Sequence, residues 1–384
     1  MSGQNSNMNN DTPHNLQILA IDPWLGGSHA AFLHAWRARS RHDVEVVGLA
    51  NRSWKWRMRA GAWELARSLH GRSIPQVMIV SDYLDLPNFF GFMPSSWAEV
   101  PCLLYMHENQ LTYPLPEGTS ESQRDTGYGF TNILSCLRAS SVLFNSTYHQ
   151  QDFSTAAQAF LKRLPKPTPA AELRNALAAS QVIAPGVDLA SIELGSGSSG
   201  PLRILYNQRW QFDKDPLAFL NAVSSLAEVD IPFELVLLGE RFRGELRGIE
   251  PALSKLAPHI VHQGYAESRS EYASLLQSCD LMLSTALHEF FGISTVEAMG
   301  AGVTPLLPNR LSYPELVGLD PGASVLYNSG EELLQRLTDH ARAPQALRQS
   351  ARRQCLRDTA LRYSDEVTSE KLDTLCQSLV TPTQ

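Results

Sequence analysis

Two series of short apolar runs, separated by one glycine- and serine-rich stretch, constrain the fold of this chain more than any other feature. The runs cover 16–21, 44–49, 77–81, 103–106 and 141–144 in the first series, and 202–206, 233–238, 259–262, 281–284 and 304–307 in the second. Helical stretches lie between the runs, which is typical of a parallel sheet. We therefore expect an α/β chain with two Rossmann-like domains whose parallel sheets face each other across a cleft.

The stretch 195–201, with the sequence GSGSSGP, is the only low-complexity segment and predicts an interdomain linker. A further short strand and turn at 181–188 precedes it. We expect a disordered N-terminus over 1–14, a first domain over 15–190, a linker over 191–201, a second domain over 202–355 and a helical C-terminal segment over 356–384.

Length and composition fit this division. The chain has 384 residues, of which 43% are hydrophobic, enough for two separate cores. Its five cysteines form no CxxC pair and are odd in number, which favours reduced thiols over a zinc knuckle or a disulfide framework. The N-terminus lacks an apolar signal segment, and no run approaches the roughly 18 apolar residues of a spanning helix. We expect a soluble, cytoplasmic protein.

Charge is distributed unevenly along the chain. The net charge of −7 disfavours binding to polyanions overall, but residues 34–72 contain nine basic residues against three acidic ones. Within this island Trp54, Lys55, Trp56, Arg57 and Arg59 alternate aromatic and basic side chains, a combination that suits phosphates and unstacked bases. The alternative is an amphipathic helix whose Trp56 packs inward, together with Trp63, while the cations face water. RNA, an anionic lipid and a sugar phosphate are all compatible ligands.

Polar or glycine-containing residues follow the runs of the first series, at 22–27, 81–85, 107–110 and 145–147. They are expected at the carboxyl edge of the sheet, where α/β folds bind ligands. Gly26 and Gly27 would let backbone amides at a helix start approach a phosphate or an acceptor, although a simple tight connection has the same sequence.

His107 follows the fourth run and could hydrogen-bond a sugar hydroxyl or serve only in packing. A metal role is disfavoured because adjacent His107 and Glu108 side chains of a strand point to opposite faces, and no second histidine follows at the required spacing. We expect no metal site.

The second series contains the motif HEFFGISTVE over 288–297, in which Glu289 and Glu297 are eight residues apart. We expect Glu289 at the sheet edge, a close backbone approach at Gly292, and a helix that opens at Ser294 and carries Glu297. These glutamates could also be a helix cap and a solvated face. The first run of this series leads to Arg209 and Lys214, and such carboxylates and cations together are what a nucleotide sugar requires.

These motifs resemble those of retaining glycosyltransferases of family 4, which have the GT-B fold. Segments 54–59, 81–86, 105–114, 128–132 and 144–146 resemble more narrowly the tRNA-queuosine mannosyltransferase group of that family. The resemblance implies transfer of mannose from GDP-mannose to the cyclopentene-diol of queuosine in the anticodon of tRNA-Asp, without a cofactor or an obligatory metal. It also implies an acceptor-binding first domain, a nucleotide-sugar-binding second domain and a terminal helix that packs back on the first.

The resemblance assigns roles to particular residues. Arg209 and Lys214 would neutralise the diphosphate, Glu289 would hold the donor sugar and Glu297 the ribose, while His107 would orient the mannose. The remaining implied donor contacts are Gly26, Gly27, Phe291, Gly292, Ile293 and Ser294, and the implied acceptor contacts are Asn109, Trp54, Lys55, Trp56, Arg57 and Arg59.

Asp82 and Asp85 follow the third run, and one of them is expected to contact the secondary amine or the diol of queuosine. Their ordinary alternative is a helix cap or a turn. Two other functions remain open for the whole chain: a family 4 transferase with a lipid or polysaccharide acceptor, and a non-catalytic RNA-binding protein with a transferase fold.

Overall fold

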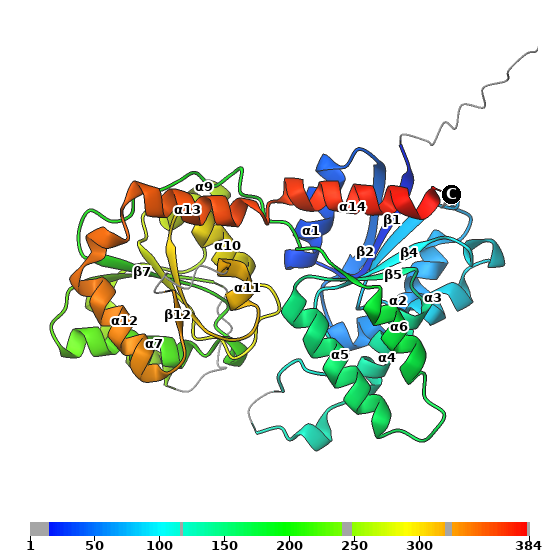
Figure 1. The fold of residues 1–384 in the computed structure, drawn as a ribbon, viewed down its shortest axis with the longest axis horizontal. Helices are drawn as coiled ribbons and strands as arrows, with labels where there is room; N and C mark the ends of the chain where they lie inside the picture. Colours follow the sequence, from blue (N-terminus) through cyan, green and yellow to red (C-terminus); the bar gives the residue numbers. More distant parts are fainter. Residues whose placement is uncertain (1–14, 116–117, 240–247, 319–324, 382–384) are drawn as a thin grey trace, which may run out of the picture.

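The computed structural model describes residues 15–115, 118–239, 248–318 and 325–381. The expected disorder over 1–14 lies outside these residues. Two α/β domains, each built on one parallel sheet, lie side by side (Figure 1).

The first sheet has six parallel strands in the order β2-β1-β3-β4-β5-β6. Its strands are β1 (Gln17–Leu25), β2 (Asp43–Ala50), β3 (Val77–Ser81), β4 (Cys102–Met106), β5 (Ser141–Phe144) and β6 (Gln181–Val182). Its helices are α1 (Gly27–Arg39), α2 (Trp54–Leu69), α3 (Leu86–Phe92), α4 (Thr126–Arg138), α5 (Thr147–Lys162) and α6 (Ala170–Ala178).

The second sheet also has six parallel strands, in the order β12-β11-β10-β7-β8-β9. Its strands are β7 (Leu202–Asn207), β8 (Phe233–Leu238), β9 (Ile260–Gln263), β10 (Leu281–Leu283), β11 (Thr304–Pro308) and β12 (Leu326–Tyr327). Its helices are α7 (Pro216–Glu228), α8 (Ile249–Leu256), α9 (Arg269–Gln277), α10 (Ile293–Gly300), α11 (Tyr313–Val317), α12 (Gly330–Arg342) and α13 (Ser350–Leu361). The sequence analysis missed β12, which is only two residues long.

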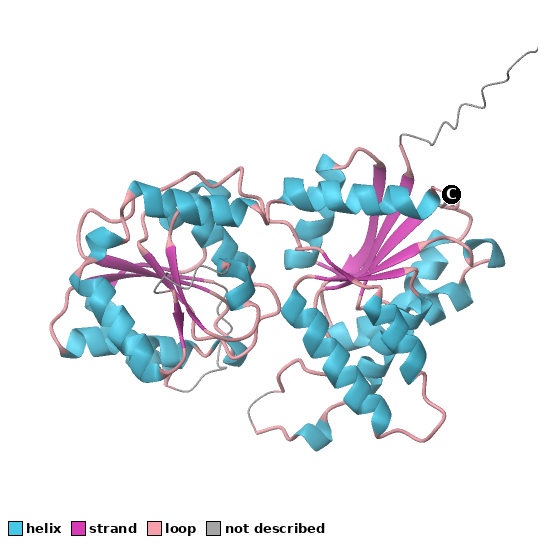
Figure 2. Ribbon diagram, viewed as in Figure 1, coloured by secondary structure: helices cyan, strands magenta, loops and turns pink. Residues whose placement is uncertain are grey.

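Helices cover both faces of each sheet (Figure 2). Strands β3 and β4 are buried along their whole length. Burial on both faces explains why the strands appear in the sequence as continuous apolar runs and not as alternating patterns. The predicted α/β class with two parallel sheets is confirmed.

The chain crosses between the domains twice, and the two crossings are hydrogen-bonded to each other. Val187 forms a parallel bridge with Ser364; its N–H donates to the Tyr363 carbonyl at 2.9 Å, and its carbonyl accepts from Asp365 N at 3.1 Å. The segment expected as a linker packs on the second domain, where Gly195 N donates to the Ala301 carbonyl. The connection between the domains is thus a paired one.

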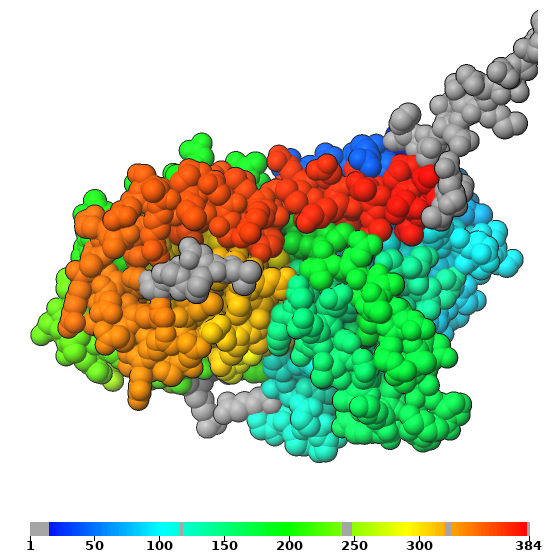
Figure 3. All heavy atoms as spheres, in the orientation of Figure 1, coloured from blue at the N-terminus to red at the C-terminus, as the bar shows by residue number. Residues whose placement is uncertain are grey.

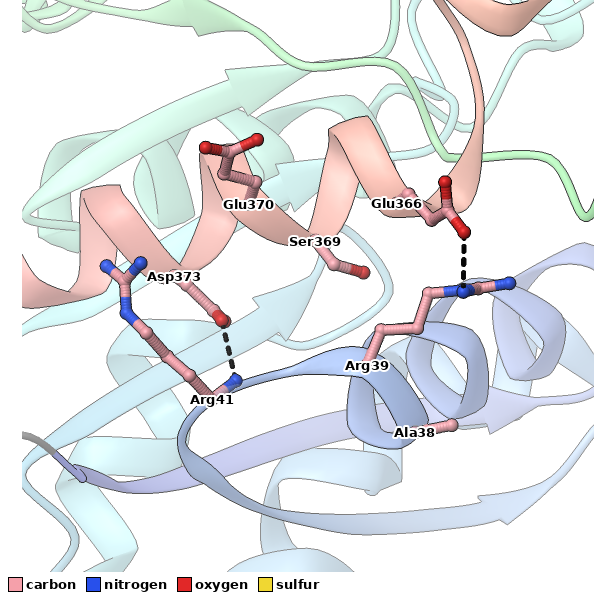
Figure 4. Close-up of a pocket in the computed structure, with 7 residues that line it drawn as sticks. All are labelled: Ala38, Arg39, Arg41, Glu366, Ser369, Glu370 and Asp373. Carbon is pink, nitrogen blue, oxygen red and sulfur yellow. Dashed lines mark hydrogen bonds and ion pairs between the residues drawn. The ribbon is translucent and has the colours of Figure 1, made fainter.

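After the second crossing, α14 (Asp365–Val380) packs along α1 of the first domain. Helix α13 spans residue 355, the expected end of the second domain. Together α13 and α14 form a continuous band across both domains (Figure 3). Asp373 accepts from Trp36 Nε1 and from Arg41 N, both at 2.8 Å. Arg39 and Arg41 line a pocket between α1 and α14 (Figure 4). Arg39 also pairs with Asp365 and Glu366.

Within the described segments, no helix has the length and apolar character needed to span a membrane.

Candidate active site

The two motifs of the second domain meet around Lys214. This residue ends a short 3-10 helix, Phe212–Lys214, and is buried. Its Nζ donates to the His288 carbonyl at 2.6 Å and lies 3.2 Å from Glu289 Oε2 and 3.3 Å from Asp213 Oδ2. A buried ammonium is costly unless its charge is compensated, and the two carboxylates supply that compensation.

Arg209 is half exposed beside this cluster. Its Nη2 lies 3.8 Å from Asp213 Oδ2. Tyr113 of the first domain interacts with Arg209: burial raises the pKa of the Tyr113 hydroxyl, and the charge and hydrogen bond of Arg209 oppose that rise. The guanidinium is thus held where the two domains meet.

The 288–297 motif forms a loop and the first half of α10. The helix begins at Ile293, one residue before the expected start at Ser294. Gly292 precedes it with a φ of 105°, and a Cβ there would lie 2.9 Å from Leu316 Cδ1. The left-handed backbone at this position favours glycine. No side chain caps this helix, so its first amides are not engaged by a capping group. Phe291 is buried, and Ile293 and Ser294 are half-buried.

Each carboxylate oxygen of Glu297 accepts a hydrogen bond. Arg269 Nη1 donates to its Oε1 at 2.7 Å, and the Tyr272 hydroxyl donates to its Oε2 at 2.6 Å. The Tyr272 oxygen in turn accepts from Asn207 Nδ2 at 2.6 Å. Burial, followed by the Glu297 charge, raises the pKa of Tyr272 well above its usual value. Sequence reasoning missed Arg269 and Tyr272, which belong to no recognisable motif.

In the first domain, His29 and His107 form a stacked pair at the carboxyl edge of the sheet. His29 Nδ1 lies 2.8 Å from Asp22 Oδ2, and the His29 ring stacks on the His107 ring at 3.9 Å between centroids. Burial alone would lower the pKa of His29, but the charge and hydrogen bond of Asp22 raise it to about 9. Burial, followed by the charge of His29, keeps the pKa of His107 well below its usual value. At neutral pH the pair is one imidazolium stacked on one neutral imidazole.

Asp22, His29 and His107 also bring ligand atoms within 4.8 Å of one another, a grouping that could hold a metal ion. The sequence analysis did not predict this grouping because it considered His107 and Glu108 alone. Asp22 is already engaged by protein groups, since its Oδ1 accepts from Trp24 N and its Oδ2 pairs with His29.

The glycine pair lies at the start of α1, next to this cluster in the chain. Gly26 precedes the helix, and no side chain caps it. A Cβ at Gly26 would lie 2.2 Å from the Asn51 side chain, whereas one at Gly27 would meet no atom within 4 Å. The close contact at Gly26 leaves no room for a side chain, and Gly27 leaves open space above the helix start.

The two aspartates after β3 differ in environment. Asp82 is completely buried; its Oδ1 accepts from His107 N at 2.9 Å, and its Oδ2 has no partner among the described residues. Burial raises the pKa of Asp82 well above its usual value. Asp85 caps α3, accepting from Asn88 N and from Asn88 Nδ2. Asp85 is therefore a helix cap, as the alternative interpretation expected. Asp82 supports the backbone of His107.

The segment after β4 contains one residue that sequence reasoning missed. Glu108 is half-buried, and its Oε1 accepts from the Tyr83 hydroxyl at 2.5 Å and from Gln110 Nε2 at 3.2 Å. Asn109, predicted to contact the acceptor, is completely buried, and its Oδ1 accepts from Leu111 N and Thr112 N. Asn109 thus shapes the loop that carries Glu108.

Helix α2 presents aromatic and basic side chains to solvent. Trp56 and Trp63 are 63% and 50% exposed, so the expected alternative in which they pack inward is wrong. Lys55 and Arg59 are exposed, and Arg59 lies over the Tyr128 ring at 4.3 Å.

Two other residues of the aromatic and basic segment do not lie on that exposed face. Arg57 is buried and donates to Glu64 at 2.9 Å and to the Ala50 carbonyl at 3.1 Å. Trp54 is half-buried against Tyr83 and Tyr128. We therefore give Arg57 no place in a binding surface.

The two sheet edges are joined by direct contacts. Ser146 Oγ donates to the Phe290 carbonyl, and the His149 ring stacks on the Phe290 ring at 3.9 Å. Asn145 connects this contact to the other site, because its Oδ1 lies 2.9 Å from His149 Nδ1 and its Nδ2 donates to the His107 carbonyl at 2.8 Å. The loops that carry His107 and Glu289 are therefore part of one hydrogen-bonded assembly.

A second contact between the domains lies at the start of α5. The Glu315 carboxylate accepts from Thr147 N, from the Thr147 hydroxyl and from Tyr148 N, at distances from 2.9 to 3.3 Å. A carboxylate of one domain thus occupies the helix start of the other, where the helix dipole favours negative charge.

Comparison with known proteins gives a separate match for each half of the chain. Residues 17–187 match the N-terminal domain family of tRNA-queuosine alpha-mannosyltransferases, and residues 196–353 match glycosyl transferases group 1. A tRNA-queuosine alpha-mannosyltransferase from Drosophila melanogaster is 32% identical over 348 residues, covering 88% of this chain and 89% of that protein.

A GDP-mannose:cellobiosyl-diphosphopolyprenol alpha-mannosyltransferase from Xanthomonas campestris is 26% identical over 165 residues, 42% of each chain. Among solved structures, HepE from Anabaena in complex with UDP has a TM-score of 0.67 at 16% identity, covering 94% of this chain and 100% of that one. Sucrose-phosphate synthase from Thermosynechococcus elongatus has a TM-score of 0.71 at 14% identity, covering 94% and 99%. These structures confirm the GT-B fold.

Proposed function

The chain belongs to the tRNA-queuosine alpha-mannosyltransferase family, and from this premise we propose that it transfers mannose from GDP-mannose to the cyclopentene-diol of queuosine in the anticodon of tRNA-Asp. The observation that carries the proposal is the direct link between the Glu289–Phe290 loop and the His107 loop through Asn145 and Ser146. It joins a candidate donor site to a candidate acceptor site, as a transfer reaction requires.

On the donor side, Lys214 and Arg209 neutralise the diphosphate. Asp213 lies beside both cations, and Glu289 lies beside Lys214. When the donor binds, its phosphates replace carboxylate as the partner of Lys214, and Glu289 becomes available to the hydroxyls of the sugar. Backbone amides at 292–295 and at Gly26–Gly27 supply neutral donors to the phosphates.

Glu297 holds the ribose in this proposal. Because both of its oxygens are already engaged, the ribose hydroxyls replace or share the hydrogen bonds from Arg269 and Tyr272. A carboxylate that is held in place by two donors is preorganised and loses little freedom when the ligand arrives.

The transfer itself retains the anomeric configuration. An acceptor hydroxyl oxygen bonds to C1 of mannose on the face that the diphosphate leaves, the bond from C1 to the diphosphate oxygen breaks, and the hydroxyl proton passes to a diphosphate oxygen. The products are mannosylated tRNA and GDP. Arg209 and Lys214 stabilise the negative charge that develops on the leaving group, which is the main protein contribution.

His107 orients the mannose as a neutral hydrogen-bonding group. The stacked His29 imidazolium, held by Asp22, fixes its ring. The charge of His29 favours a neutral His107, which can accept a hydrogen bond from a sugar hydroxyl.

The exposed side of α2 is the proposed contact for tRNA. Lys55 and Arg59 pair with phosphates, and Trp56 and Trp63 offer faces on which unstacked bases can stack.

The free state of all five cysteines supports a cytoplasmic location, where a tRNA acceptor is available.

The test is a transfer assay with purified protein, GDP-mannose and queuosine-bearing tRNA-Asp. We expect a hexose mass increment on the queuosine nucleoside, and none on tRNA with guanosine at that position. The proposal is wrong if folded protein that binds GDP-mannose leaves queuosine unchanged. A mannosylated polyprenol product and binding to liposomes instead of tRNA would identify the lipid-directed alternative, for which the Xanthomonas relative is the supporting observation.

A further inference from the structure

Glu108 is a carboxylate at the acceptor edge whose hydrogen bonds come from neutral groups. The Tyr83 hydroxyl and the Gln110 amide both donate to its Oε1. Across the described segments 15–115, 118–239, 248–318 and 325–381, no basic side chain forms an ion pair with it, and no donor to its Oε2 is found. A half-buried carboxylate with this set of partners has room for one further cationic donor.

The charge of Glu108 acts on two cations, His29 and Arg209, without forming an ion pair with either of them in the described part of the chain. Asp22 is neutralised by its ion pair with His29. The Asp82 Oδ1 accepts from His107 N, and its buried Oδ2 has no partner among the described residues. Glu108 thus keeps one carboxylate oxygen open at the acceptor edge, next to His107 in the chain. A carboxylate oxygen in this position attracts an ammonium group.

Aromatic rings cluster around Tyr83, the residue whose hydroxyl donates to Glu108. Tyr83, which donates to Glu108, stacks on Trp24 with centroids 5.8 Å apart and an interplanar angle of 18°. Trp54 meets the Tyr83 ring edge-on at 6.4 Å and the Tyr128 ring at 5.3 Å. Trp24 and Trp54 remain partly exposed. Ring faces beside a carboxylate are the combination that binds organic cations, and flat rings also stack on unpaired bases.

We propose that Glu108 is an acceptor-specificity residue that binds the secondary amine through which the cyclopentene-diol of queuosine is attached, with Trp24, Tyr83 and Trp54 packing around the base and the linker. This inference rests on the proposed function and deepens it. Tyr83, which donates to Glu108, contacts the His29 ring, and His29 stacks on His107. An amine bound at Glu108 therefore brings the attached diol to the sugar that His107 orients. An acceptor without a cation gains nothing from this residue.

The test measures binding and transfer separately. Full-length protein is titrated with two anticodon stem-loop RNAs that differ at one position, one carrying guanosine and one carrying 7-aminomethyl-7-deazaguanosine, which has the amine but lacks the diol. We expect the wild-type protein to bind the amine-bearing RNA about 10- to 100-fold more tightly, the range for a hydrogen bond to a charged group. Glu108→Gln, which can still accept from Tyr83 and Gln110, should lose this preference and keep its affinity for GDP-mannose.

Glu45→Gln serves as the matched control, because it removes an exposed carboxylate of the same domain that pairs with Arg72. It should keep the preference for the amine. In transfer to queuosine-bearing tRNA, Glu108→Gln should raise the acceptor KM by a similar factor and change kcat little.

The outcomes separate the two proposals. A Glu108→Gln protein that retains the amine preference, or one that also loses affinity for GDP-mannose, overturns the role of Glu108. A wild-type protein that prefers the amine but transfers no mannose supports the cation site and contradicts the proposed function.

Discussion

The Lys214 ammonium lies 3.2 Å from the Glu289 carboxylate, although the two residues are 75 positions apart in the chain. One follows β7 and the other follows β10, and these strands are neighbours in the second sheet. The cation proposed to neutralise the leaving diphosphate is thus held by the carboxylate proposed to bind the sugar. We propose that donor binding exchanges the partners of this existing pair.

Lys214→Gln tests this exchange. The substitution removes the charge that stabilises the leaving diphosphate, so we expect kcat to fall about 100- to 1000-fold, the range for loss of one preorganised group at a developing anion. Steady-state transfer at saturating GDP-mannose measures the change. Lys255→Gln, at an exposed position of α8, should retain wild-type kcat. An unaltered kcat in Lys214→Gln would remove this residue from the leaving-group site.

The fold was largely predictable because parallel strands buried on both faces are continuous apolar runs. The expected runs 77–81, 141–144 and 233–238 are β3, β5 and β8 without a shift at either end. Strand β12 was missed, whereas the equally short β6 was expected as part of the strand and turn at 181–188. The helix after Gly292 was placed one residue late, since Ser294 looks like a cap in the sequence, whereas the left-handed Gly292 precedes the helix.

The site was predictable where a motif is local and unpredictable where it depends on packing. Lys214 and Glu289 were found through their own motifs, but their contact depends on the strand order. Arg269 and Glu108 were missed because their partners are distant in the chain or belong to another element. The burial of Arg57 on a helix with exposed Arg59 could not be inferred from composition, because the two residues differ only in which side of α2 they occupy.

Glu297→Gln is expected to weaken donor binding without slowing transfer. The amide cannot accept charge-assisted hydrogen bonds from ribose hydroxyls or pair with Arg269, so the KM for GDP-mannose should rise about 10-fold. A ribose contact is made equally before and during the reaction, and kcat should therefore change little. Glu267→Gln removes an exposed carboxylate near the start of α9 and should leave both constants unchanged. A fall in kcat with an unchanged KM would contradict the ribose assignment.

Stability should depend on pH through His29. Its pKa rises from 6.5 to about 9 on folding, so its contribution is fully present below pH 6.5 and is lost as the pH rises through 9. The shift corresponds to about 3 kcal/mol. The melting temperature should decrease between pH 6.5 and 9 in the wild type and more weakly in His29→Gln. His34→Gln, at an exposed position of α1, should follow the wild type; equal slopes in all three proteins would show that the Asp22 pair contributes no pH-dependent stability.

Arg57 and Arg59 form a matched pair for the proposed tRNA surface, since they are two residues apart but only Arg59 is exposed. Each phosphate contact releases counterions, so Arg59→Gln should reduce the slope of log Kd for tRNA against log salt by about 1. Arg57→Gln should keep the wild-type slope and instead lower the melting temperature, because it removes the bonds to Glu64 and to the Ala50 carbonyl. Binding titrations over a range of salt concentrations measure both slopes. If Arg59→Gln kept the wild-type slope, or if Arg57→Gln reduced it as strongly as Arg59→Gln, the phosphates would not lie along the exposed side of α2.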